Sequence, residues 1–87
     1  MSRKFKVDVR QEDINYGGRS ARDCPIAKAM DRLRIGEFAV YEDSLYSTIP
    51  WERYSWPDIT NTNIHSWIRR YDAGLPVKPF SFDVVLD

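Results

Sequence analysis

The 87-residue chain is poor in the residues that mark many functional classes. It has one cysteine, Cys24, and one histidine, His65, and its 13 basic residues balance its 13 acidic ones. A single cysteine excludes an intrachain disulfide and favours a reducing compartment, so we expect a cytoplasmic protein. The first residues lack the pattern of a signal peptide, and no apolar run is long enough to cross a membrane, so we expect no membrane partner.

The short motifs that hold metals, phosphates or nucleic acid are also missing. There is no Cys-x-x-Cys or His-x-x-x-His pair, so we expect no metal site and interpret His65 as a polar residue. Gly17-Gly18 precedes a predicted helix, but neither phosphate-loop spacing occurs, so we expect a turn and no cofactor. Anion binding by Arg19 and Arg22 is the alternative. The zero net charge disfavours direct nucleic-acid binding.

The pattern of apolar residues predicts a single α+β domain over residues 1–87, because these residues recur with the periods of strands and helices. We expect strands over 5–9, 37–42, 44–49 and 80–86, and helices over 25–33 and from a cap at Asn61 or Thr62 to Gly74. Residues 11–23 are read as a loop with at most one helical turn, and residues 51–60 as a loop rich in aromatics. The order β-α-β-β-α-β is ferredoxin-like and predicts one antiparallel sheet with two helices on one face and the first and last strands paired.

The two helices and the two outer strands should share one core. Their apolar positions are the residues we expect to meet there: Phe5, Val7, Val9, Met30, Ile64, Trp67, Ile68, Phe80, Phe82 and Val84.

Cys24 is the residue with the most potential for chemistry. A thiol at a helix N-terminus can have a lowered pKa, and a nearby His65 would complete a Cys–His pair. No local nucleophile signature accompanies it, and with Pro25 at the first helical position either Asp23 or Cys24 can cap the helix. We therefore expect a structural thiol and a non-enzymatic protein, with a thiol-dependent enzyme as the third hypothesis.

An aromatic segment is the main candidate for binding. Two tryptophans, a tyrosine and an arginine fall within six positions, the composition of an interface hot spot. Closure of the core and stacking of nucleic-acid bases are the alternatives. We predict that at least one tryptophan is exposed, and that the partner-binding residues are Trp51, Arg53, Tyr54 and Trp56, with Tyr41 and Tyr46 from the preceding strands.

Several short motifs resemble a family of small uncharacterised bacteriophage and mobile-element proteins. They are Val7-Asp8-Val9, Gln11 to Ile14 with Gly17, Cys24 to Ala27, Ile68 to Val77 and Pro79 to Phe82. The resemblance implies no catalytic residue or cofactor. Some small phage proteins inhibit host defence, including anti-CRISPR proteins, so it implies an inhibitor that binds and blocks a host protein complex. A nucleic-acid-binding accessory or regulatory protein is the second hypothesis.

Overall fold

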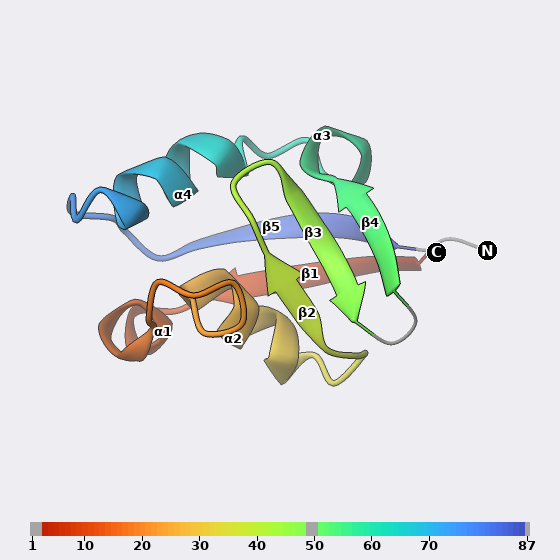
Figure 1. Cartoon of the computed structure of the whole chain (residues 1–87), viewed down its shortest axis with the longest axis horizontal. Coiled ribbons are helices and arrows are strands. Elements are labelled where there is room, and N and C mark those ends of the chain that lie inside the picture. The colour runs from red at the N-terminus through yellow and green to blue at the C-terminus, as the bar shows by residue number, and fades with distance from the viewer. Residues whose placement is uncertain (1–2, 49–50, 87) are drawn as a thin grey trace.

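The computed structural model describes residues 3–48 and 51–86 (Figure 1). In chain order its elements are β1 (Arg3–Val9), α1 (Gln11–Tyr16), α2 (Pro25–Arg32), β2 (Phe38–Val40), β3 (Ser44–Thr48), β4 (Trp51–Ser55), α3 (Trp56–Ile59), α4 (Ile64–Asp72) and β5 (Phe80–Leu86). No helix in these residues is both long enough and apolar enough to cross a bilayer.

The strands form two antiparallel sheets, not one. The first and last strands pair as predicted, with Val7 opposite Phe82, while β2, β3 and β4 make a separate sheet in that order. The expected single ferredoxin-like sheet is therefore not what the structure shows. A single sheet would need β3 to pair with β1, but β4 already occupies that edge of β3. The outer edge of β2 is also engaged, because Val40 N–H donates to the carbonyl of Ala21 at 2.7 Å.

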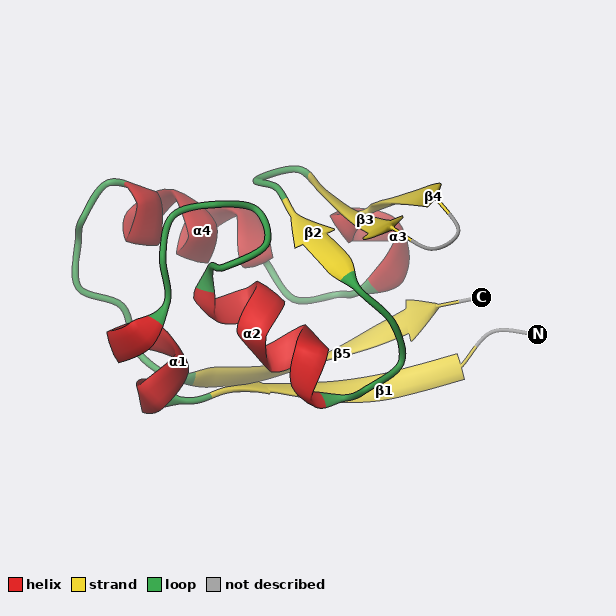
Figure 2. Cartoon of the chain, turned by 60° about the horizontal axis from the view of Figure 1, so that its bottom comes forward, coloured by secondary structure: helices red, strands yellow, loops and turns green. Residues whose placement is uncertain are grey.

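The two sheets lie in separate layers with helices between and beside them. In Figure 1 the three-stranded sheet crosses in front of the β1–β5 pair, with α2 on one side and α4 on the other. Figure 2 shows α2 between the β1–β5 pair and β2. The expectation of two helices covering one face of one sheet is accordingly replaced by four helices placed around two sheets.

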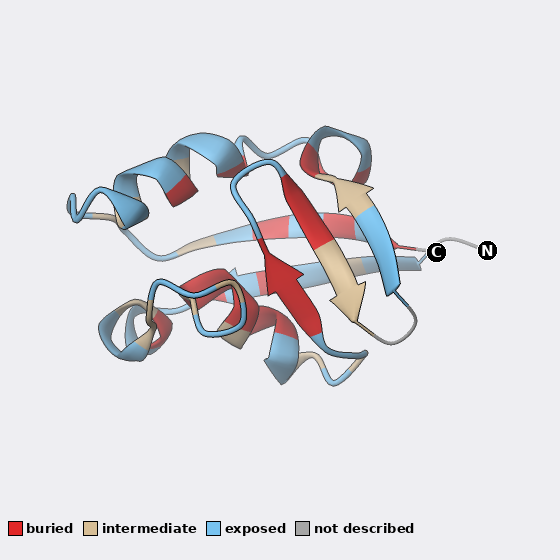
Figure 3. Ribbon diagram, in the orientation of Figure 1, coloured by how far each residue is buried: buried red, intermediate tan, exposed pale blue. Residues whose placement is uncertain are grey.

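The buried residues form one cluster between these layers (Figure 3). The core set expected from the sequence is confirmed: Val7, Val9, Met30, Ile64, Ile68, Phe82 and Val84 are buried, and Phe5, Trp67 and Phe80 pack against them. This common core holds the three-stranded sheet against the rest of the molecule.

The start of α2 and the end of α4 match the predicted signals, whereas the start of α4 does not. Cys24 caps α2 with its sulfur, and Gly74 follows α4 in the left-handed region at φ 77°. Helix α4 is capped by Asn63, whose Oδ1 accepts from Ser66 N–H at 3.3 Å, so the expected caps at positions 61 and 62 are wrong. Thr62 instead donates its own N–H to the hydroxyl of Thr60 in the preceding turn.

Two segments expected to be loops contain regular structure. Residues 11–16 form a six-residue helix. At its N-terminus the Arg10 N–H donates to Asp13 Oδ2 at 2.9 Å. The prediction of a loop over 51–60 is the larger error, because β4 and α3 follow each other directly there. Pairing with β3 supplies the hydrogen bonds that stabilise β4, and Pro57 is tolerated in the first turn of α3. The predicted strand ends at Ile49 and Pro50 lie outside the described residues.

Candidate functional site

The outer face of the three-stranded sheet gathers four of the six predicted binding residues. Side chains alternate along each strand, so Leu45 and its partner Tyr54 face the core. Their neighbours Tyr46 and Arg53, which also pair with each other, face the opposite way. Trp51 pairs with Thr48 on that same outer side. We call Tyr41, Tyr46, Trp51 and Arg53 the aromatic face.

Three rings of the aromatic face touch in sequence. The centroids of Tyr41 and Tyr46 lie 5.3 Å apart with planes at 80°, and those of Tyr46 and Trp51 lie 6.3 Å apart at 72°. Both are edge-to-face contacts, the favourable geometry for aromatic pairs. The exposed fraction is 72% for Trp51 and 48% for Tyr41. Two exposed rings are therefore held in place by the half-buried ring of Tyr46 before any partner arrives.

The remaining two predicted residues lie elsewhere. Trp56 is only 3% exposed, packs edge-to-face on Phe82, and donates its Nε1–H to the carbonyl of Tyr41 at 2.9 Å. Tyr54 packs against the core, and its hydroxyl donates to Glu52 Oε2 at 2.6 Å. The expectation that at least one tryptophan is exposed is confirmed by Trp51, while Trp56 belongs to the core and is not available to a partner.

The segment that builds this sheet is acidic, a feature that the neutral whole chain conceals. Residues 37–58 contain one basic side chain, Arg53, and five acidic ones: Glu37, Glu42, Asp43, Glu52 and Asp58. All five acidic residues are exposed. Counting charge over this window of the sequence would have revealed the asymmetry, which total charge cannot show. Glu37 pairs with Arg22 and Glu42 with Arg69, so the acidic excess of this segment comes from the other three carboxylates, and that excess favours a basic partner surface.

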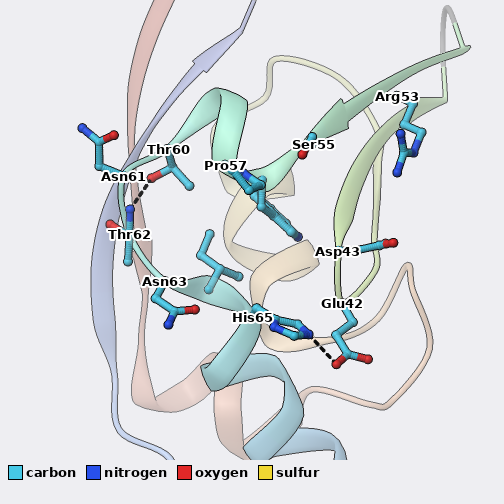
Figure 4. Close-up of a pocket in the computed structure, with 12 residues that line it drawn as sticks. Glu42, Asp43, Arg53, Ser55, Pro57, Thr60, Asn61, Thr62, Asn63 and His65 are labelled. Carbon is cyan, nitrogen blue, oxygen red and sulfur yellow. Dashed lines mark hydrogen bonds and ion pairs between the residues drawn. The ribbon is translucent and has the colours of Figure 1, made fainter.

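A cavity of about 580 Å³ opens beside the aromatic face (Figure 4). We call it the side pocket. The turn between β2 and β3 forms one wall, and the segment from Thr60 to His65 forms another. His65 Nε2 lies 2.6 Å from Glu42 Oε1, and Arg69 Nε lies 3.4 Å from the same oxygen. These contacts link the N-terminal part of α4 to the β2–β3 turn.

Cys24 and His65 are not brought together as a catalytic pair. The Cys24 sulfur accepts from Ala27 N–H at 3.4 Å and lines a smaller cavity, whereas His65 lines the side pocket. Burial, followed by the nearby Asp72 carboxylate, raises the pKa of the Cys24 thiol, although backbone N–H groups partly oppose this. A raised pKa keeps the sulfur protonated at neutral pH, where a thiol is a weak nucleophile.

We expect Cys24 to behave as a structural thiol. Cys24→Ser keeps an acceptor at the helix N-cap and should change the free energy of unfolding by about 1 kcal/mol or less. Wild-type Cys24 should react with a disulfide reagent more slowly than free cysteine at pH 7, because its thiolate fraction is smaller. Thiol titration against time measures this. Reaction at least as fast as free cysteine would contradict the assignment.

No group of three or more histidine, cysteine, aspartate or glutamate residues within 3–48 and 51–86 is placed to hold a metal ion. Comparison with known proteins returned no match: no family model, no curated protein and no solved structure is significantly similar to this chain. The function of the aromatic face is therefore inferred from its own geometry and charge.

Proposed function

We propose that this chain is a small non-enzymatic protein that docks its aromatic face on a larger host protein complex and blocks it. The carrying observation is the row of Tyr41, Tyr46 and Trp51, in which the exposed Tyr41 and Trp51 rings are held in edge-to-face contact with the half-buried Tyr46 ring between them. Tyrosine, tryptophan and arginine are the residues most enriched at interface hot spots. Rings ordered in advance lose little conformational freedom on binding, which favours affinity.

The charge around the aromatic face supports a protein partner with a basic surface. Three of the five exposed carboxylates in residues 37–58 form no ion pair with a basic residue in the described parts of the chain, and these three, of Asp43, Glu52 and Asp58, would repel a phosphate backbone. Complexes that handle nucleic acid must expose arginine and lysine patches. Together with the resemblance to phage proteins, this favours a nucleic-acid-guided defence complex as the partner, in the manner of an anti-CRISPR inhibitor. The nucleic-acid-binding alternative is disfavoured by the same charges.

Trp51→Ala is expected to weaken binding to the partner by about 2 kcal/mol, roughly 30-fold in Kd. The ring is mostly solvent-exposed in the free protein, so its loss should barely change the melting temperature. Isothermal calorimetry with the captured complex measures the first quantity, and a thermal melt measures the second. Tyr16→Ala is the matched control, because Tyr16 is 80% exposed on α1, outside the aromatic face.

The partner itself is sought by capture from bacterial lysate treated with nuclease, followed by mass spectrometry. A specific partner must be retained by wild type and Tyr16→Ala and lost by Trp51→Ala and Tyr46→Ala. Its binding should weaken only moderately with salt, and the captured complex should lose activity when the chain is added. Retention by the Trp51 and Tyr46 variants would refute the proposal. Capture that disappears with nuclease would support the nucleic-acid alternative instead.

A further inference from the structure

The side pocket adjoins the aromatic face and shares Arg53 with it. The β2–β3 turn supplies carboxylates from Glu42 and Asp43, and the α3–α4 segment supplies amides from Asn61 and Asn63 (Figure 4). A partner seated on the aromatic face would therefore reach over this opening. The cavity volume of about 580 Å³ is in the range that accepts a large side chain together with its flanking backbone.

The interior of the side pocket combines apolar and polar groups. Trp56 and Ile64 are buried residues that form its apolar lining together with the exposed Pro57. The Trp56 ring is fixed by its hydrogen bond to the Tyr41 carbonyl, so this surface is rigid. An occupant needs an apolar stem to lie against these residues and a polar head to reach the carboxylates.

The carboxylates determine the charge of that head. Glu42 already contacts His65 and Arg69 through Oε1. Asp43 accepts the Ser44 hydroxyl at 3.0 Å and forms no ion pair with any residue in the described parts of the chain. Arg69 thus offsets Glu42, and Asp43 is the carboxylate of the lining that is left for a cationic ligand.

We propose that the side pocket receives an arginine side chain of the partner protein. This inference rests on the proposed function, because the arginine belongs to the protein that docks on the aromatic face. Arginine carries an apolar stem suited to Trp56 and Pro57, and its five donors can serve carboxylate and amide oxygens together. Its guanidinium is more weakly hydrated than the lysine ammonium, so it enters a partly buried site more readily.

The test titrates the free protein with the peptide acetyl-Gly-Arg-Gly-amide and follows amide and indole signals by NMR. Saturable shifts are expected at Trp56 Nε1–H, Asn61 and His65. The matching citrulline peptide has the same shape without the charge and should bind roughly tenfold more weakly or worse. Equal shifts with the two peptides would overturn the proposal, as would shifts confined to Tyr46 and Trp51.

Two variants test whether the arginine peptide binds in the side pocket or on the surface nearby. Asp43→Asn should weaken the arginine peptide by roughly tenfold, because it removes the charge and keeps the acceptor of the Ser44 hydroxyl. Asp58→Asn is the matched control, since Asp58 is exposed on α3 and does not line the side pocket. If Asp43→Asn binds as wild type, the assignment is wrong. The citrulline comparison uses wild-type protein and decides the question even if a variant unfolds.

Failure of the pocket and failure of the docking surface have different signatures. Trp51→Ala should bind the arginine peptide like wild type, because Trp51 does not line the side pocket. A partner that binds Trp51→Ala normally counts against the aromatic face and leaves the peptide result intact. A peptide that does not distinguish arginine from citrulline counts against the pocket and leaves the aromatic face intact.

Discussion

Trp56→Ala is expected to lower the free energy of unfolding by about 3–5 kcal/mol, the usual range for truncating a buried aromatic side chain. The ring is 3% exposed, packs on Phe82, and holds the Tyr41 carbonyl through its Nε1–H. The substitution leaves a cavity beneath the three-stranded sheet and also removes a donor from that carbonyl. Urea denaturation followed by circular dichroism measures the change.

Trp51→Ala is the matched control for Trp56→Ala. The same chemical change, five positions earlier on the exposed face, should alter the free energy of unfolding by about 0.5 kcal/mol or less. If both variants lose similar stability, the division between a buried and an exposed tryptophan is wrong. If neither does, Trp56 is not part of the core.

Asp13→Ala is expected to destabilise the protein by about 3 kcal/mol. Asp13 is 4% exposed, accepts from the Arg10 N–H at 2.9 Å, and forms an ion pair with Arg32. Arg32 also donates to the carbonyl of Asp8 at 3.1 Å, so this pair ties α2 to α1 and to the end of β1. Its removal leaves a partly buried guanidinium without its carboxylate, which is the main cause of the loss.

The neighbouring Glu12 provides the contrast. It forms an exposed ion pair with Arg10 at 3.5 Å, and such pairs contribute about 0.2–1 kcal/mol. Glu12→Ala should therefore change the urea midpoint only slightly. A double-mutant cycle of Asp13→Ala with Arg32→Ala should show coupling between the two residues. Additive effects would mean that the ion pair itself stabilises little.

The parts of the fold that the sequence predicts correctly carry their signal locally. Strands β1 and β5 alternate apolar and polar residues, and α2 has an N-terminal proline after its cap, so each can be recognised alone. Strand β4 carries no such signal, because Trp-Glu-Arg-Tyr-Ser mixes aromatic and polar residues on both faces. Only pairing with β3, which is a contact between segments, makes it a strand.

The candidate site also depends on contacts between segments, which the local sequence does not show. Composition was enough to single out Trp51, Arg53, Tyr41 and Tyr46, but not to separate them from Tyr54 and Trp56. For Tyr54 that separation depends on the register in which Tyr46 lies opposite Arg53 and Leu45 lies opposite Tyr54, whereas Trp56 is set apart because it begins α3. Once β4 is known to be a strand, its two-residue period assigns Tyr54 to the inner face. Charge within residues 37–58 was available in the sequence, but only a window of that length reveals it.

The alternation along β3 and β4 has a consequence for how this protein can change over generations. Inner residues such as Leu45 maintain the core, whereas Tyr46, Trp51 and Arg53 contribute chiefly to the outer surface. Mutations at the outer positions can accumulate without unfolding the chain, so selection by a changing partner can act on them directly. The three-stranded sheet thus offers variable positions on a constant support.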